Sequence, residues 1–309
     1  MMLPSSSPDP TRKVAEYFDE QADHWRSVYE AGGVEGLIYR QRQQAAEELV
    51  GRAGAAPRDR LLEVGPGAGR LSLRLTELGW RVHAIDISPA MVGQTRLGAV
   101  AAEVGDRLTL AAGDVQKLAF RDASFDAAVA VGVVPWLPEP LTGLRELHRV
   151  LRPGAHLVVT SDNRNRLTHL VDPVLNPWLR SVYLRVMPVL AGAGLWRGAQ
   201  ASGGQRVEEQ RYTVDAMERL LGDAGFRVLE SRTIGFWPFT LRRHHIFGPQ
   251  RSLHVHRRLQ DLADSPRRFW ATAGNHHLVL AARIPSGRGL ATNSRRSDQK
   301  SAQRDQWPV

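Results

Sequence analysis

The stretch that decides the fold is residues 61–70, which read LLEVGPGAGR. A short apolar run leads into three glycines spaced by two, Gly65, Gly67 and Gly69, and then into a segment with helical periodicity. Glycines in such a turn let the backbone bend sharply and let a ligand approach without meeting a Cβ. The dinucleotide pattern G-x-G-x-x-G would need a glycine where Arg70 stands, so the spacing disfavours a nicotinamide-dependent oxidoreductase.

Acidic residues accompany this turn and follow the next two predicted strands. Glu63 stands two residues before the first glycine, where a carboxylate would repel a pyrophosphate but would suit a cationic ligand that carries an amino acid. Asp86 lies 19 residues after Gly67, at a position where an acid can accept both hydroxyls of a ribose. Asp114 follows the third strand and is placed to bond an adenine amino group. The pattern predicts an adenosine pocket without a phosphate clamp.

Strands and helices alternate along the chain around this turn. Apolar strand patterns occupy residues 60–64, 81–86, 108–112, 125–131, 156–160, 227–233 and 277–283. Helical patterns occupy residues 36–52, 71–78, a segment opened by Ser88 and Pro89, residues 140–151 up to an Arg152-Pro153-Gly154 stop, and residues 213–225. This alternation predicts a doubly wound, mostly parallel, Rossmann-like seven-stranded α/β sheet with helices on both faces.

One domain of residues 13–284 is expected between two flexible tails, residues 1–12 and residues 285–309, which are polar and aperiodic. The region 161–211 breaks the rhythm, because about fifty residues stand where a short crossover would suffice. We expect a helical insertion there, after the fifth strand, that caps a substrate site. Its large apolar residues indicate a hydrophobic acceptor, or else a cap that packs on the core.

Composition excludes several classes of protein. The 309 residues include no cysteine, which rules out disulfides, thiolate metal sites and a catalytic thiol. No apolar run reaches the ~18 residues of a membrane span, and the N-terminus lacks the pattern of a secretory signal, so we expect a cytoplasmic protein. Three histidine pairs lack converging partners, so no metal site is predicted.

The formal charge of +9 is confined to the C-terminal quarter. Residues 240–309 contain 13 Lys and Arg against 4 Asp and Glu, whereas residues 1–239 are balanced. Within this quarter, arginines mixed with apolar residues over 241–268 read as an amphipathic surface, which would make weak contact with an anionic membrane or form a solvated helical face. The charge therefore gives no support for nucleic-acid binding.

Three segments together resemble the class I S-adenosylmethionine-dependent methyltransferases, in the small-molecule branch related to quinone-biosynthesis methylases. They are residues 61–92, residues 113–137 and residues 144–159. The resemblance implies S-adenosyl-L-methionine as the cofactor and a small-molecule acceptor as the partner. By position it also implies that Gly65, Gly67 and Gly69 pass the methionine part, Glu63 steadies the turn, Asp86 holds the ribose, Asp114 and Val115 meet the adenine, and Gly132 with Val133 faces the sulfonium.

The N-terminal helical segment resembles the lid of such enzymes. Residues 17–25, YFDEQADHW, are similar to the aromatic and acidic helix that covers the cofactor, so residues 13–53 are expected to form a helical lid. Trp25, Tyr29 and Tyr39 are candidate lid aromatics, since aromatic faces favour a sulfonium. An amphipathic helix packed on the sheet is the other interpretation.

A general base is needed only if the acceptor keeps its proton, as a hydroxyl does at neutral pH. Asp162 follows the fifth strand, His169 lies a few residues into the insertion, and His24 lies in the lid, so these three are the candidate catalytic residues. A hydroxyl oxygen is the expected acceptor atom, with carbon or nitrogen as the nearest alternative. A nucleic-acid methylase and an inactive cofactor-binding protein fit less well, because residues 132–136 read GVVPW and the glycines are intact.

Overall fold

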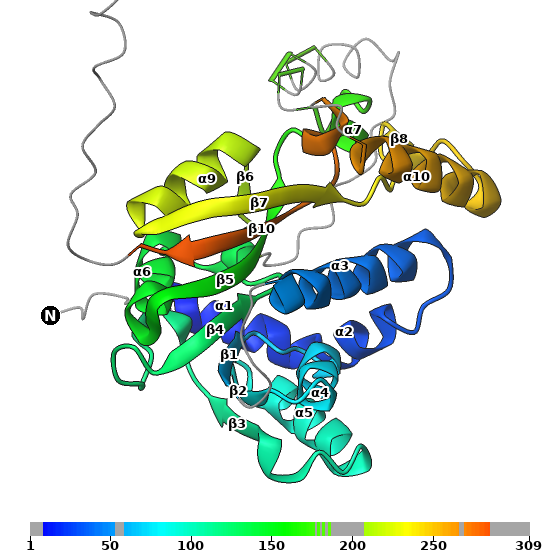
Figure 1. Ribbon diagram of the computed structural model, residues 1–309. Helices are drawn as coiled ribbons and strands as arrows, with labels where there is room; N and C mark the ends of the chain where they lie inside the picture. The colour runs from blue at the N-terminus through cyan, green and yellow to red at the C-terminus, as the bar shows by residue number, and fades with distance from the viewer. Residues whose placement is uncertain are drawn as a thin grey trace, which may run out of the picture.

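The computed structural model describes residues 9–52, 59–176, 178–179, 181–182, 185–186, 207–265 and 269–284. The carboxyl-terminal tail and about half of the insertion predicted over 161–211 lie outside these ranges. Figure 1 shows a twisted central sheet with helices packed on its two faces.

The sheet has the topology that the alternation predicts. Its seven long strands are ordered β3-β2-β1-β4-β5-β10-β7. Strands β1 to β4 pair in parallel with one another or with β5, and β10 runs antiparallel to both β5 and β7. Their bounds are β1 (Arg60–Val64), β2 (Arg81–Asp86), β3 (Leu108–Ala112), β4 (Phe125–Ala130), β5 (Leu151–Asn163), β7 (Phe226–Ile234) and β10 (His276–Arg283). The doubly wound, mostly parallel architecture is confirmed.

Two short pairings add to the predicted seven strands. Strand β6 (Arg211–Tyr212) pairs in parallel with the end of β5 and makes the sheet eight-stranded. Strands β8 (Thr240–Leu241) and β9 (His244–His245) form a separate hairpin. Such two-residue pairings carry too little periodicity to be recognised in a sequence.

The two faces of the sheet are buried under different helices. Along β4, Ala127 and Val129 belong to the core formed with α3 (Gly33–Arg52) and α4 (Arg70–Glu77). The alternate residues Ala128 and Ala130 belong to the core formed with α6 (Pro140–Val150) and α9 (Val214–Asp223). Alternating burial of both faces explains why these strands are apolar throughout. Helix α5 (Pro89–Ala101) lies beside α4 (Figure 1).

The helix caps show how closely local chemistry decides the element boundaries. The Ser88 hydroxyl accepts a hydrogen bond from the Met91 amide at 3.1 Å and so caps α5, as predicted. Helix α1 (Pro10–Glu20) begins inside the segment predicted as a flexible tail. Asp9 accepts from the Thr11 amide at 3.0 Å, and Pro10 takes the first helical position, so the described part of that segment is helical.

The prediction that Arg152-Pro153-Gly154 forms the stop at the end of a helix needs a correction. Helix α6 already ends at Val150, and the proline and glycine lie within β5. The pairing register jumps there from Phe125 opposite Leu151 to Ala127 opposite His156, so residues 152–155 form an irregularity in the strand. A Pro-Gly pair is tolerated at such a bulge because no regular ladder bond is required of it.

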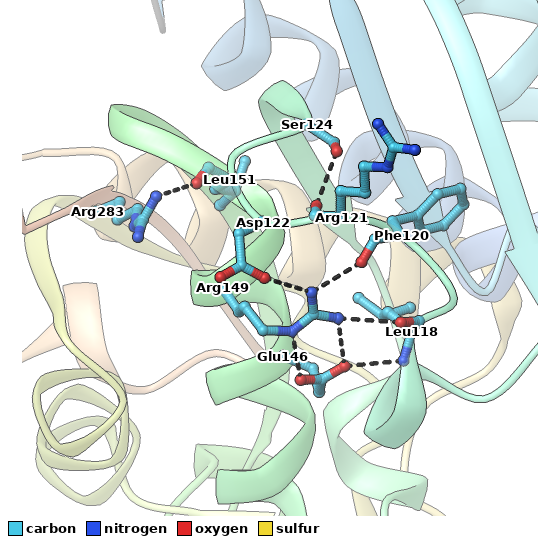
Figure 2. A network of polar contacts seen from close by, with 9 residues as sticks. All are labelled: Leu118, Phe120, Arg121, Asp122, Ser124, Glu146, Arg149, Leu151 and Arg283. Carbon is cyan, nitrogen blue, oxygen red and sulfur yellow. Dashed lines mark hydrogen bonds and ion pairs between the residues drawn. The ribbon is translucent and has the colours of Figure 1, made fainter.

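Arg149 fastens the end of α6 to the loop that precedes β4, as Figure 2 shows. Its guanidinium donates to Glu146 and Asp122 and to the carbonyl oxygens of Leu118 and Phe120, at 2.7–3.0 Å. The hydrogen bonds to Glu146 and Asp122 raise the pKa of Arg149. The network fixes this loop at the edge of the sheet opposite the ligand-binding end.

None of the helices in the described ranges combines the length and the apolar character that crossing a bilayer requires.

Candidate active site

A large cavity opens at the carboxyl ends of the parallel strands, where ligands bind in doubly wound sheets. Its empty volume, including the open mouth, is about 1090 Å³. It is lined by the glycine turn, by the residues that follow β2, β3 and β4, and by aromatic side chains from the N-terminal helices.

The three glycines of the turn have different structural roles. All three have positive φ, at 66°, 57° and 79° for Gly65, Gly67 and Gly69, in the left-handed region that favours glycine. A Cβ on Gly65 would lie 2.5 Å from a Val133 methyl, and one on Gly69 would lie 2.6 Å from a Thr95 methyl. A Cβ on Gly67 would meet nothing within 4 Å. Gly67 therefore faces the cavity, Gly65 also lines it, and Gly69 serves the packing of the turn on α5.

Glu63 lies beneath the turn and does not line the main cavity. Its side chain is buried and accepts a hydrogen bond from the Ser72 hydroxyl of α4 at 2.5 Å. Burial raises the pKa of Glu63 to about 7, against the lowering effect of the Ser72 hydrogen bond and with a contribution from the nearby Asp86 carboxylate. This hydrogen bond joins the end of β1 to the helix that follows the turn, and the steadying role of Glu63 stays a prediction.

Asp86, Asp114 and Val115 line the cavity together, as predicted. Asp86 accepts hydrogen bonds from the amides of Ser88 at 2.9 Å and Gly67 at 3.3 Å, and burial raises its pKa to about 6. The Asp114 carboxylate accepts from the Gln116 amide at 2.8 Å. These bonds hold both carboxylates in fixed orientations at the cavity wall.

The N-terminal helices contribute aromatic side chains to this cavity. Trp25, Tyr29 and Tyr39, the candidate lid aromatics, all line it, and their role as a lid over a cofactor stays a prediction. Phe18 and Trp136 extend the aromatic wall, with their ring centroids 5.2 Å apart. These rings come from four different elements and enclose one side of the cavity in apolar surface.

Asp19 fastens the lid to the sheet domain. Its carboxylate accepts from the Ser88 hydroxyl at 2.5 Å and from the Ala90 amide at 3.1 Å, at the N-terminus of α5. A carboxylate is favoured there by the helix dipole and by the free amides of the first turn. This contact joins α1 to the strand end that carries Asp86.

Arg42 is a cavity residue that sequence reasoning missed. It is only 7% exposed, its guanidinium lies 4.7 Å from the centre of the Tyr39 ring, and it lines the cavity beside Gly132. In the described part of the chain its Nε finds no hydrogen-bond partner. The guanidinium also forms a hydrogen bond with Tyr29, and a buried cation at the wall of a ligand cavity is suited to an anionic group.

A polar cluster occupies the same cavity at the end of β5. Asp162 and His276 form a hydrogen bond of 2.9 Å between Oδ1 and Nδ1, and Glu209 bonds to Asp162 from the other side. Despite burial, His276 and the Glu209 hydrogen bond lower the pKa of Asp162. Burial and the Asp162 carboxylate raise the pKa of Glu209 to about 7.

The other two candidate bases are placed differently from Asp162. His24 is exposed, and His169 accepts from the Arg166 guanidinium at 3.0 Å; neither lines the cavity. Burial and the neighbouring arginines lower the pKa of His169 to about 3. Asn163 donates to the carbonyl oxygens of Thr272 and Gly274 and so supports the strand end. Of the three, the structure brings only Asp162 to the cavity among the described residues.

Comparison with known proteins identifies the domain. Residues 62–159 match a family model described as a methyltransferase domain. The chain is 28% identical, over 159 residues, to a ubiquinone/menaquinone biosynthesis C-methyltransferase from Geobacter sp. (strain M21), covering 50% of this chain and 64% of that protein. It is 30% identical, over 142 residues, to a malonyl-[acyl-carrier protein] O-methyltransferase from Serratia marcescens, covering 46% of this chain and 53% of that protein. The matches thus span about half to two thirds of these relatives.

Solved structures agree on the fold. A magnesium protoporphyrin IX methyltransferase from Synechocystis PCC 6803, determined with bound S-adenosylmethionine, superposes with a TM-score of 0.56 at 18% identity, covering 90% of this chain and 99% of that one. The predicted Rossmann-like fold is therefore confirmed: residues 62–159 match the methyltransferase domain model, and the fold is that of a solved methyltransferase that binds S-adenosylmethionine. Within the described ranges, no group of three or more acidic or histidine side chains is arranged to hold a metal ion.

Proposed function

We propose that the protein transfers a methyl group from S-adenosylmethionine to a hydroxyl oxygen of a small, hydrophobic acceptor. The observation that carries the proposal is the single cavity in which the glycine turn, an aromatic wall and the polar cluster of Asp162, Glu209 and His276 meet. A cofactor half and an acceptor half in one enclosed space provide the alignment on which methyl transfer depends.

The described residues fit this cofactor. S-adenosylmethionine, when bound, supplies a methyl group already activated on a sulfonium. The Arg42 guanidinium at the cavity wall suits the methionyl carboxylate, and Asp86 suits the ribose hydroxyls. Asp114 and Val115 would meet the adenine, and Gly132 with the aromatic wall would lie near the sulfonium, which π-faces attract.

The cavity wall supports the choice of acceptor. Phe18, Trp25 and Trp136 provide apolar surface for an aromatic or lipid-like molecule, and the polar cluster provides groups that can handle a hydroxyl proton. One relative is named a malonyl-[acyl-carrier protein] O-methyltransferase and another a ubiquinone/menaquinone biosynthesis C-methyltransferase, so a carbon acceptor is the principal alternative.

Two measurements test the proposal. Isothermal titration calorimetry with S-adenosylmethionine should show one site per chain, and absence of binding would refute the enzyme class. Incubation with methyl-labelled cofactor and a panel of phenols, quinols and hydroxylated polyketides should then transfer label to oxygen. Mass spectrometry and NMR of the product separate an ether from a new carbon–carbon bond, and the latter would replace oxygen by carbon as the acceptor.

The cytoplasmic location and the membrane contact predicted for residues 241–268 are part of this proposal. Helix α10 (Pro249–Ala263) exposes Arg251, Arg257 and Arg258, and the neighbouring hairpin exposes Leu241 and Ile246. Cations beside apolar side chains suit an anionic bilayer. Sedimentation with phosphatidylglycerol vesicles, and much less with phosphatidylcholine vesicles, is the expected result; equal sedimentation would refute the contact.

A further inference from the structure

His276 is brought to the cavity by strand pairing. It opens β10, and the antiparallel register places it directly opposite Asp162 at the end of β5. Its Nδ1 lies 2.9 Å from Oδ1 of Asp162, and the Tyr39 ring lies 6.2 Å away, centre to centre. His276 lines the same cavity as Gly132, at the end of the sheet where a methyl acceptor must enter.

The protonation state of His276 follows from its surroundings. Burial lowers the pKa of His276, the Arg42 and Arg166 guanidinium groups lower it further, and the Asp162 carboxylate opposes them. The ring is therefore neutral at pH 7. A carboxylate can only accept, so the single ring proton resides on Nδ1 and the lone pair on Nε2. No described residue forms a hydrogen bond with Nε2.

We propose that His276 is the general base of the reaction and that Asp162 is its positioning residue, an inference that rests on the proposed transfer to oxygen. The acceptor oxygen gives its proton to Nε2 and forms a bond to the methyl carbon, while the carbon–sulfur bond breaks and its electron pair goes to sulfur. The imidazolium so formed is stabilised by Asp162 and later releases its proton to water.

The charges around His276 make Asp162 and Glu209 less suitable than His276 as the base. Asp162 is a poor base because its pKa is lowered, and it already accepts hydrogen bonds from His276 and Glu209. Glu209 retains a proton to higher pH, since burial and Asp162 raise its pKa to about 7. Arg42, Arg166 and Tyr39 also face the pair, and the two cations oppose a permanent charge on His276.

The first test does not need an acceptor. Full-length protein labelled with ¹⁵N-histidine, with and without S-adenosylmethionine, should show His276 as the neutral Nδ1–H tautomer at pH 7, with the resonance assigned by its loss in His276→Gln. Asp162→Asn offers an amide donor to Nδ1 and should move the ring toward the Nε2–H tautomer. A wild-type ring that is charged or carries its proton on Nε2 would overturn the proposal.

The second test varies the acidity of the acceptor. For weakly acidic phenols, His276→Gln should lower kcat by about 10²-fold or more, the usual range of general-base catalysis. For nitrophenols, which are largely ionised at pH 8, the loss should be much smaller. The matched control is His148→Gln, a half-buried histidine that contacts the Ile284 carbonyl away from the cavity.

The outcomes separate the base from the proposed function. Calorimetry should give the same cofactor affinity for His276→Gln and the wild type, which shows that the variant folds. A loss of rate that is equal for all phenols would overturn the base alone. Failure of the wild type to methylate any hydroxyl acceptor would overturn the proposed function, and with it the base.

Discussion

The buried Glu63 carboxyl makes the stability of the protein depend on pH in a direction that can be calculated. Glu63 is 2% exposed, and its carboxylate accepts a hydrogen bond from the Ser72 hydroxyl at 2.5 Å. We expect Glu63→Gln, which cannot ionise, to become progressively more stable than the wild type as pH rises.

The magnitude follows from the pKa of this group. The pKa of Glu63 rises from 4.5 to about 7 on folding. At ~1.4 kcal/mol per pKa unit, ionising this carboxyl costs about 3 kcal/mol more in the folded protein than in the unfolded chain. Between these two values the unfolded chain has lost the proton while the folded protein holds it. The free energy of unfolding therefore falls as pH rises, and the contribution of Glu63 is fully lost above about pH 7.

Urea unfolding of wild type and variant between pH 4.5 and pH 8.5 measures this difference. Subtracting the free energy of unfolding of the wild type from that of the variant at each pH removes the titration of other groups. The difference should change by about 3 kcal/mol in favour of Glu63→Gln over this range. Glu77→Gln, at the exposed end of helix α4, which carries Ser72, controls for the amide substitution. A difference between Glu63→Gln and wild type that is constant with pH would refute the reasoning.

Three further substitutions test the cavity and its supports. Asp86→Ala should weaken binding of S-adenosylmethionine by about 100-fold or more in calorimetry, because two charge-assisted hydrogen bonds are worth roughly 1.5–3 kcal/mol each; unchanged affinity would contradict the ribose assignment. Asp19→Ala releases the lid from Ser88 and should weaken the same binding about tenfold, with little change in Tm. Arg149→Ala removes the guanidinium that donates to Glu146 and to two carbonyl groups. The free energy of unfolding measured in urea should therefore fall by on the order of 3 kcal/mol, and the cofactor affinity of the folded protein should not change.

The cavity residues around the glycine turn could be predicted because short, local sequence patterns identify them. Gly67, Asp86 and Asp114 each follow an apolar strand directly, and parallel strands bring their carboxyl ends to one edge. The boundaries of β2 and the Ser88 cap were predicted correctly for the same reason, since apolar alternation and capping act over a few residues.

The acceptor half could not be predicted in this way. His276 reaches Asp162 through a pairing across 114 positions, and the register of an antiparallel strand is decided by the packing of the whole sheet. Arg42 lies in a helix whose sequence reads as an ordinary polar surface, and neighbours distant in the sequence, such as Gly132, help to bury it. The Pro-Gly stop failed because a bulge inside a strand uses the same residues as a helix end.

Strand β10 lies between β5 and β7, and this position determines the order in which the parts of the cavity can assemble. A chain leaves the ribosome from its N-terminus, so β1 to β5 emerge with the glycine turn and Asp86 while His276 is still to be synthesised. Strand β7 emerges earlier but cannot join the sheet until β10 fills the place beside β5. The nascent protein thus contains the glycine turn and Asp86 well before His276 can complete the cavity.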